Sequence, residues 1–271
     1  EAAAPLPAEP IIRGTSMRIR IATLLTSAVL AVSAASAQEF RIGLQEDPDV
    51  LDPHRARTFV GRIVFTSLCD KLIDIDTKLN FVPQLATEWL WSNDNKTLTF
   101  NLRENVVFHD GTPFNAEAAK ANIDRARTLP DSLRKSELAS VESVEVVDEY
   151  TLALNLSQPD ATLLAQLSDR AGMMLSPAAF QGDVGTNPVC SGPYKFVSRV
   201  QNDRLVLEKF NEYRDADEYH FERLVFLPIP DSTVRLANLR AGDLDMLERL
   251  NPSDAGSVRT DPALQFVPIA G

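Results

Sequence analysis

Reactive and metal-binding side chains are scarce in this chain of 271 residues. It has two cysteines and three histidines, and His54, His109 and His220 are far apart. No H-E-x-x-H motif, Cys/His cluster or glycine-rich phosphate loop is present. No G-x-S-x-G elbow surrounds a serine, since Ser191 in "CSGPY" lacks the second glycine. The sequence therefore gives no positive support for an enzyme, a metal site or a cofactor.

The sequence also lacks an excess of positive charge. Acidic residues number 38 and basic residues 27, which gives a net charge of −11, and no basic block occurs. Such a surface is unfavourable for nucleic acid and for anionic membrane surfaces, so we expect no nucleic-acid partner. No internal repeat interrupts residues 38–271, which are enough for one large domain or two lobes.

Long apolar runs are limited to the N-terminal part. Met17, Arg18 and Arg20 precede an apolar stretch over 21–32, and an A-x-A sequence follows at 35–37. This order predicts a secretory signal peptide over 17–37, with Gln38 as the new N-terminus. The alternative, a membrane anchor, needs about 20 apolar residues. No cysteine follows the cleavage site, so we expect no lipid anchor. Residues 1–16 are interpreted as an upstream extension, from a misplaced gene start or a cloning scar.

The two cysteines, Cys69 and Cys190, leave two possibilities open. In an oxidising compartment they could form a disulfide, or they could be separately buried thiols. Sequence alone does not show whether their Cα atoms come close enough for a bridge. A metal site is disfavoured, because neither cysteine has a Cys or His neighbour at ligand spacing.

Short alternating stretches dominate the chain and predict a mixed α/β fold with many hairpins. We predict strands at 40–44, 144–147, 151–156, 195–200, 205–209 and 224–229, two further strand stretches within 86–108 around the turn cluster at 92–95, and the start of another at 243–246. Helices are predicted over 58–72, 116–127 and 161–167, and after Asp231 or Ser232 up to Gly242.

The stretch "VFHDGTPFNAEAAKANIDRA" at 106–125 has an alternative reading as a histidine–carboxylate site. A strand is predicted to end at Phe108, Asp110-Gly111 predicts a tight turn, and Asn115 is a good helix N-cap. His109 has no His or Cys partner nearby, and we expect it to be solvated. Paired carboxylates such as Glu46-Asp47 and Asp243/Asp245 are interpreted as solvated loop residues.

Five motifs occur in the order and near the spacing of a known family. They are "LDPH" (51–54), "LCDKLIDID" (68–76), "PQLATEWLWSNDNKTLTFNLRENVVFHDGTPFNAE" (83–117), "PVCSGPYKFV" (188–197) and "FLPIPDSTVRLANLRAGDLDM" (226–246). The sequence resembles the periplasmic solute-binding proteins of ABC importers of the large peptide and nickel class, extracellular solute-binding protein family 5.

This resemblance implies a two-lobed, type II clamshell fold. Residues 38–70 and 184–262 would form lobe I, 71–183 an inserted subdomain, and 263–271 the start of a second lobe that is absent. The chain is thus expected to be a fragment of a longer protein. The family usually shows G-T-G-P-Y where this sequence has Cys190-Ser191-Gly192-Pro193-Tyr194, and a bridge from Cys190 to Cys69 would explain the substitution.

The resemblance also implies a function. A small solute, with a di- or oligopeptide expected, would be captured between the lobes of a monomeric periplasmic protein and passed to a membrane permease and ATPase, with no bond made or broken. We expect Gln45, Glu46 and Asp47 to face the cleft, where the two acids could bind an ammonium group of the ligand. Arg170 is expected to bind a carboxylate, and Met173 to line the cleft. The alternatives are an exported hydrolase or peptidase, and a solute sensor subunit.

Overall fold

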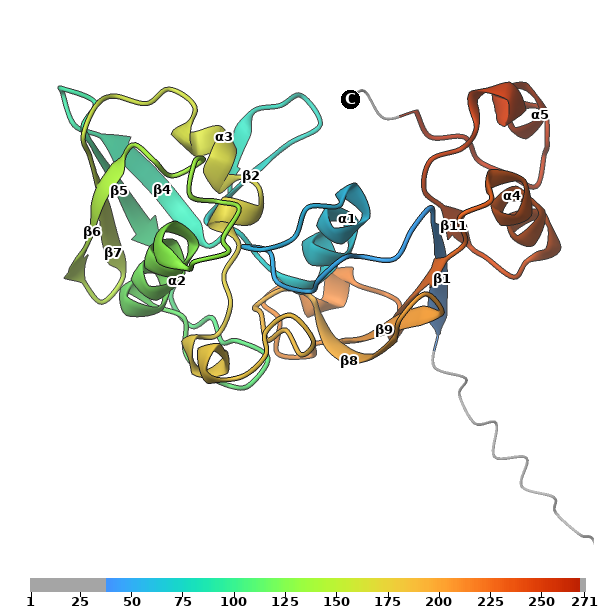
Figure 1. Ribbon diagram of the computed structural model, residues 1–271, viewed down its shortest axis with the longest axis horizontal. Coiled ribbons are helices and arrows are strands. Elements are labelled where there is room, and N and C mark those ends of the chain that lie inside the picture. Colours follow the sequence, from blue (N-terminus) through green and yellow to red (C-terminus); the bar gives the residue numbers. More distant parts are fainter. Residues whose placement is uncertain (1–37, 269–271) are drawn as a thin grey trace, which may run out of the picture. The chain divides into compact units, whose positions relative to one another are not determined.

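The computed structural model describes residues 38–268 (Figure 1). The predicted upstream extension and signal peptide lie outside these residues, as do residues 269–271. The described part is mixed α/β, which confirms the predicted class, and its buried side chains form two hydrophobic cores.

The first core belongs to a four-stranded antiparallel sheet in the order β4-β5-β7-β6. Its strands are β4 (Ala86–Trp91), β5 (Thr97–Leu102), β6 (Val141–Asp148) and β7 (Thr151–Leu156). Helix α2 (Ala116–Thr128) packs on β6 and β7 (Figure 1). Next to this sheet in sequence are the short pair β2 (Ile73–Ile75) and β3 (Phe81–Pro83), and helix α3 (Leu163–Leu167). We call residues 72–174 the hairpin region.

The second core belongs to a five-stranded sheet in the order β11-β1-β10-β9-β8. Its strands are β1 (Glu39–Leu44), β8 (Tyr194–Val200), β9 (Arg204–Lys209), β10 (Arg223–Pro228) and β11 (Met246–Leu247). β1 runs parallel to both β10 and β11, whereas β8, β9 and β10 are antiparallel. Helices α1 (Phe59–Leu68), α4 (Ser232–Ala241) and α5 (Ala255–Arg259) are the remaining α-helices of the described residues. We call residues 39–69 and 175–247 the mixed-sheet region.

Local sequence signals explain where the longer helices begin and end. The Asn115 side chain accepts the amide hydrogen of Ala118 at 3.0 Å and caps α2. Asp231 caps α4 in the same way, and Gly242 ends that helix with φ +82°, a conformation that costs glycine little. These three boundaries confirm the sequence predictions.

Three sequence predictions differ from the structure for tertiary reasons. Val106–Phe108 does not form a strand, because the chain reverses at Gly111 and only one isolated bridge forms, from Val107 to Pro113. Helix α1 ends at Leu68 rather than at 72, since its last carbonyl accepts from Gly192 and Cys69 turns extended. The strand predicted to start at 243 is limited to the two residues of β11 that reach β1.

Candidate functional site

The parallel strands of the mixed-sheet region end at one common edge. Leu44 pairs with Pro228, and Gly43 pairs with Leu247, so β1, β10 and β11 finish side by side. In open sheets with parallel strands, ligands bind outside the carboxyl ends of those strands. The loops that leave this edge span 45–58, 229–231 and 248–251, and the first of them leads to α1 (Figure 1). We call this candidate site the carboxyl edge.

The predicted acidic loop lies at the carboxyl edge but not all of it is available to a ligand. Glu46 is exposed and Gln45 half-buried, and neither side chain has a hydrogen-bond partner within residues 38–268. Asp47 pairs with Arg199 at 2.8 Å and accepts the amide hydrogen of Asn202 at 2.9 Å. Asp47 therefore anchors the β8–β9 turn, while the roles of Gln45, Glu46 and Asp47 in binding stay predictions.

Arg170 and Met173 lie behind the same loop. Arg170 Nη1 donates to the carbonyl of Ala56 at 2.9 Å, and burial lowers the pKa of Arg170. Met173 is 1% exposed and belongs to the second core. Arg170 thus braces the segment that leads into α1. Neither side chain presents much surface, and the ligand contacts expected of them stay predictions.

An aromatic ring and two arginines at the carboxyl edge were missed by sequence reasoning. Phe59 fits the helical spacing of the helix predicted over 58–72, yet it is 47% exposed. The Arg249 guanidinium lies 5.5 Å from the Phe59 ring centre, and that of Arg62 lies 5.8 Å from it. Because Arg249 follows β11 and Phe59 begins α1, no local pattern in the sequence could have shown this contact.

Arg249 is held in an unfavourable backbone conformation. Its φ is +57°, in the left-handed region, which costs a residue other than glycine about 1–2 kcal/mol. Buried Arg235 fixes this loop, since its Nη2 donates to the Arg249 carbonyl at 3.2 Å and its Nη1 to those of Ile229 and Pro230. Arg235 thereby connects the loops after β10 and β11. Its bond to the Arg249 carbonyl fixes the position of the Arg249 backbone, from which that side chain extends.

Contrary to the prediction from the sequence, the His109 side chain is not solvated but holds two main-chain segments together. Its Nε2 donates to the Gly192 carbonyl at 3.0 Å, and its Nδ1 accepts the Cys190 amide hydrogen at 3.3 Å. Burial lowers the pKa of His109 to about 4, so the ring is neutral at pH 7. Ser191, between these two partners, is 1% exposed. With both ring nitrogens bonded to the main chain, His109 has no free nitrogen to take a proton from Ser191.

Cys69 and Cys190 form a disulfide in the structure, with their Cα atoms 4.8 Å apart. The pair connects the segment after α1 to the segment that returns from the hairpin region. No group of His, Cys, Asp and Glu side chains within residues 38–268 is arranged to hold a metal ion.

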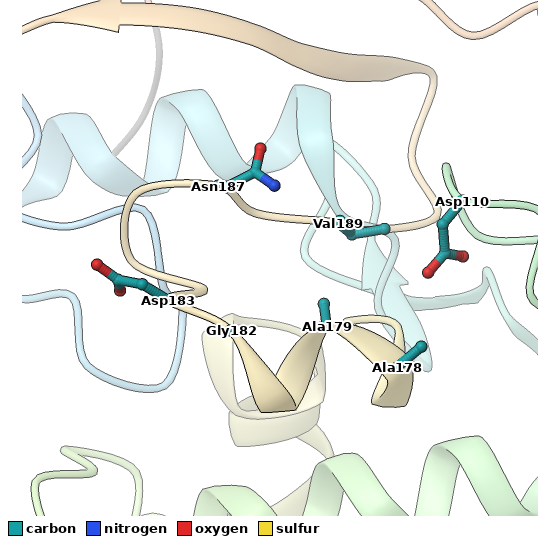
Figure 2. A pocket seen from close by; sticks show the side chains of 7 residues that line it. All are labelled: Asp110, Ala178, Ala179, Gly182, Asp183, Asn187 and Val189. Carbon is teal, nitrogen blue, oxygen red and sulfur yellow. The ribbon is translucent and has the colours of Figure 1, made fainter.

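A shallow pocket of about 260 Å³ lies between the turn at Asp110 and the segment 178–189. Figure 2 shows Asp110 and Asp183 at its two ends, with Asn187 between them. Although burial raises the pKa of Asp110, hydrogen bonds from Ser176 and Thr112 hold it below its usual value. Asp183 accepts from Gly185 and Thr186. Both carboxylates are thus engaged in local turns, and the pocket is a weaker candidate than the carboxyl edge.

Comparison with known sequences assigns the family. The bacterial extracellular solute-binding proteins, family 5, match residues 80–270. The chain belongs to this family. This result confirms the predicted resemblance. The matched segment runs from β3 to α5 and includes β10 and β11, two of the three strands that form the carboxyl edge.

Relatives within family 5 are similar over most of this chain but are longer. The glutathione-binding protein GsiB of Pectobacterium atrosepticum is 31% identical over 227 residues, which are 82% of this chain and 44% of the relative. The chain therefore spans about half the length of the curated relatives it matches.

Solved structures of other binding proteins show the same fold. The binding protein AgaA in complex with agropinic acid, from A. tumefaciens R10, has a TM-score of 0.78 at 26% identity, over 83% of this chain and 46% of AgaA. The open, unliganded murein tripeptide-binding protein MppA has a TM-score of 0.76 at 26% identity, over 84% of this chain and 48% of MppA. These neighbours are two-lobed periplasmic binding proteins, which confirms the predicted fold class. Across residues 38–268, no helix has the length and apolar character needed to cross a membrane.

Proposed function

We propose that this chain supplies one lobe of the solute-binding component of an ABC importer. The protein captures a peptide-like solute between two lobes and delivers it to a membrane permease and ATPase. The observation that carries the proposal is the family 5 match over residues 80–270. Relatives named for binding glutathione and a murein tripeptide support a peptide-like ligand. The carboxyl edge, with exposed Glu46 and Phe59, is the surface of this lobe that faces the solute.

The proposal includes a domain assignment. Residues 38–70 and 184–262 form lobe I, 71–183 an inserted subdomain, and 263–271 the beginning of the second lobe. The separate cores of the mixed-sheet and hairpin regions support this division. The mature protein works as a periplasmic monomer, exported by the signal peptide over 17–37 and not held by a lipid anchor.

Binding without catalysis is part of the same proposal. Ser191 and His109 are neighbours, but the histidine is committed to main-chain bonds and the serine is buried. A nucleophilic serine needs a base that can accept its proton. This pair therefore supports a scaffold role for His109, and it argues against a hydrolase that would use Ser191 and His109.

A thermal-shift screen tests the proposed function on the protein expressed from its complete reading frame. The solutes are glutathione, di- to pentapeptides, opines, nickel and sugars. A ligand at 100 times its Kd should stabilise the protein by about 2.7 kcal/mol and remain chemically unchanged. If no solute raises the Tm while some peptide is cleaved, the protein is a peptidase and the proposal is wrong.

A further inference from the structure

Three side chains at or next to the carboxyl edge form an exposed surface around one aromatic ring. Phe59 is the first residue of α1, and it lies outside the set of buried residues on that helix. Its ring is flanked by Arg249 and Arg62, whose guanidinium groups lie 5.5 and 5.8 Å from the ring centre. We call Phe59, Arg62 and Arg249 the arginine–phenylalanine surface.

Both arginines keep donors that the protein does not use. Arg62 forms two bonds to Asp169, from Nε at 3.0 Å and from Nη2 at 2.5 Å, which leaves Nη1. Arg249 Nε lies 3.4 Å from Glu248 Oε1, and its two Nη groups have no hydrogen-bond partner among the described residues. An arginine carries five N–H donors in a planar fork that matches a carboxylate. These Nη groups can therefore bind an anion without breaking an existing bond.

The local charge also favours an anion. Among the ion pairs around this surface, Arg62, Arg170 and Arg249 face two acids, Asp169 and Glu248, which leaves one positive charge in excess within this set. Glu46, the exposed acid at the same edge, forms no ion pair within residues 38–268. The side chain of Arg249 is 57% exposed and that of Arg62 41% exposed, so a solute can reach both. The exposed Phe59 ring offers an apolar face between them.

We infer that the arginine–phenylalanine surface binds the carboxylate end of a peptide-like solute. The carboxylate lies on the Nη groups of Arg249 and Arg62, and the adjoining apolar part of the solute lies on Phe59. This inference rests on the proposed function and adds a ligand group and the residues that hold it. It also moves carboxylate recognition from buried Arg170 to two arginines that a solute can contact.

The test compares free and C-terminally amidated forms of one peptide by isothermal titration calorimetry. The probe is the peptide that gives the largest thermal shift in the screen, and the protein comes from its complete reading frame. Removing a charge-assisted hydrogen bond weakens binding roughly tenfold or more. We expect the amide to bind at least about tenfold more weakly than the acid. Arg249→Gln should weaken binding of the acid by a similar factor and leave the amide unchanged.

Two further variants separate recognition from folding. Phe59→Leu keeps an apolar side chain but removes the ring and should weaken both peptide forms. Arg223→Gln removes an exposed arginine at the start of β10, where it pairs with Glu39 at 3.7 Å, and should change neither affinity. If acid and amide bind equally, or Arg249→Gln binds the acid normally, this inference is wrong while the proposed function stands. If no peptide binds at all, both are wrong.

Discussion

The hairpin region and the mixed-sheet region obtain their sheets in different ways. In the hairpin region, β4 pairs with β5 and β6 with β7 across short turns. In the mixed-sheet region, β1 begins the described chain and pairs with β10, which comes after the whole hairpin region. The first sheet is therefore assembled mostly from local contacts, and the second depends on closing a very long loop. Only the second brings parallel strand ends together and so creates the carboxyl edge.

The largest expected effect comes from emptying either core. Phe100 in the hairpin region and Phe226 in the mixed-sheet region are both fully buried. Replacing either with alanine should lower the free energy of unfolding by about 3–5 kcal/mol, through lost burial and the cavity that remains. Urea denaturation followed by circular dichroism measures the loss. In Phe100→Ala, amide hydrogen exchange should become faster first in β4–β7. In Phe226→Ala, it should become faster first in β9 and β10. The same pattern in both variants would mean that the two regions do not unfold separately.

The next effect concerns the base of the hairpin region. The Cys69–Cys190 disulfide closes a loop with a sequence separation of 121 residues. Replacing both cysteines with alanine should cost about 2–5 kcal/mol, because the unfolded chain regains freedom. Dithiothreitol should lower the urea denaturation midpoint of the wild type and leave the midpoint of the double variant unchanged. A wild-type midpoint that does not respond to the reductant would contradict this prediction.

Acid should weaken the contact between the two regions. His54 lies in the loop after β1, and its Nδ1 is 2.8 Å from Arg125 Nη1 of α2. Burial lowers the pKa of His54 from 6.5 to about 4. Above pH 6.5 the ring is neutral in both states. Between pH 6.5 and 4 only the unfolded chain takes up this proton, so His54 alone should lower the free energy of unfolding by up to about 3 kcal/mol. Buried His109, whose pKa is also about 4, adds a second loss over the same range.

Urea midpoints at pH 7 and pH 4.5 measure this loss. His54→Gln should show a smaller drop between the two pH values than the wild type does. Exposed His220→Gln is the matched control and should show the full drop. An identical drop in all three proteins would show that His54 is not the group responsible.

The smallest expected effect is at a helix cap near the carboxyl edge. Asp231 accepts the amide hydrogens of Thr233 at 2.8 Å and Val234 at 3.0 Å. Asp231→Ala should cost about 1 kcal/mol. Asp243→Ala, which removes an exposed acid just beyond the same helix, should cost less than about 0.5 kcal/mol. Equal midpoints for the two variants would mean that the cap contributes nothing.

Sequence patterns predicted the hairpin region well, apart from the strand ending at Phe108. The turn at Gly111, the cap at Asn115 and the paired strands β6 and β7 depend on neighbouring residues, and the structure has them where the pattern indicates. His109 shows the limit of such reasoning. It lies in a turn, where side chains are usually exposed. Its hydrogen-bond partners come from residues 190–192, and no residue near 109 in the sequence indicates them.

The carboxyl edge was predicted only in part. The acidic loop after β1 was found because a predicted strand ends there, but Arg199 as partner of Asp47 was not foreseen. Phe59 fits the helical spacing predicted over 58–72, but that spacing did not show that its ring is exposed. A period states which residues share a face of a helix, and the neighbouring elements decide how much of that face is covered.

By itself, the sequence determined the α/β class, most strands and helix caps, and a resemblance to family 5, because these depend on residues close together in the chain or on motifs in order. Only the tertiary structure decided that β1 lies between β10 and β11, that Cys69 meets Cys190, and that Arg249 lies against Phe59. Each of these contacts joins segments separated by more than a hundred residues. The packing of the whole chain determines which of these distant segments meet, and no local sequence pattern indicates it.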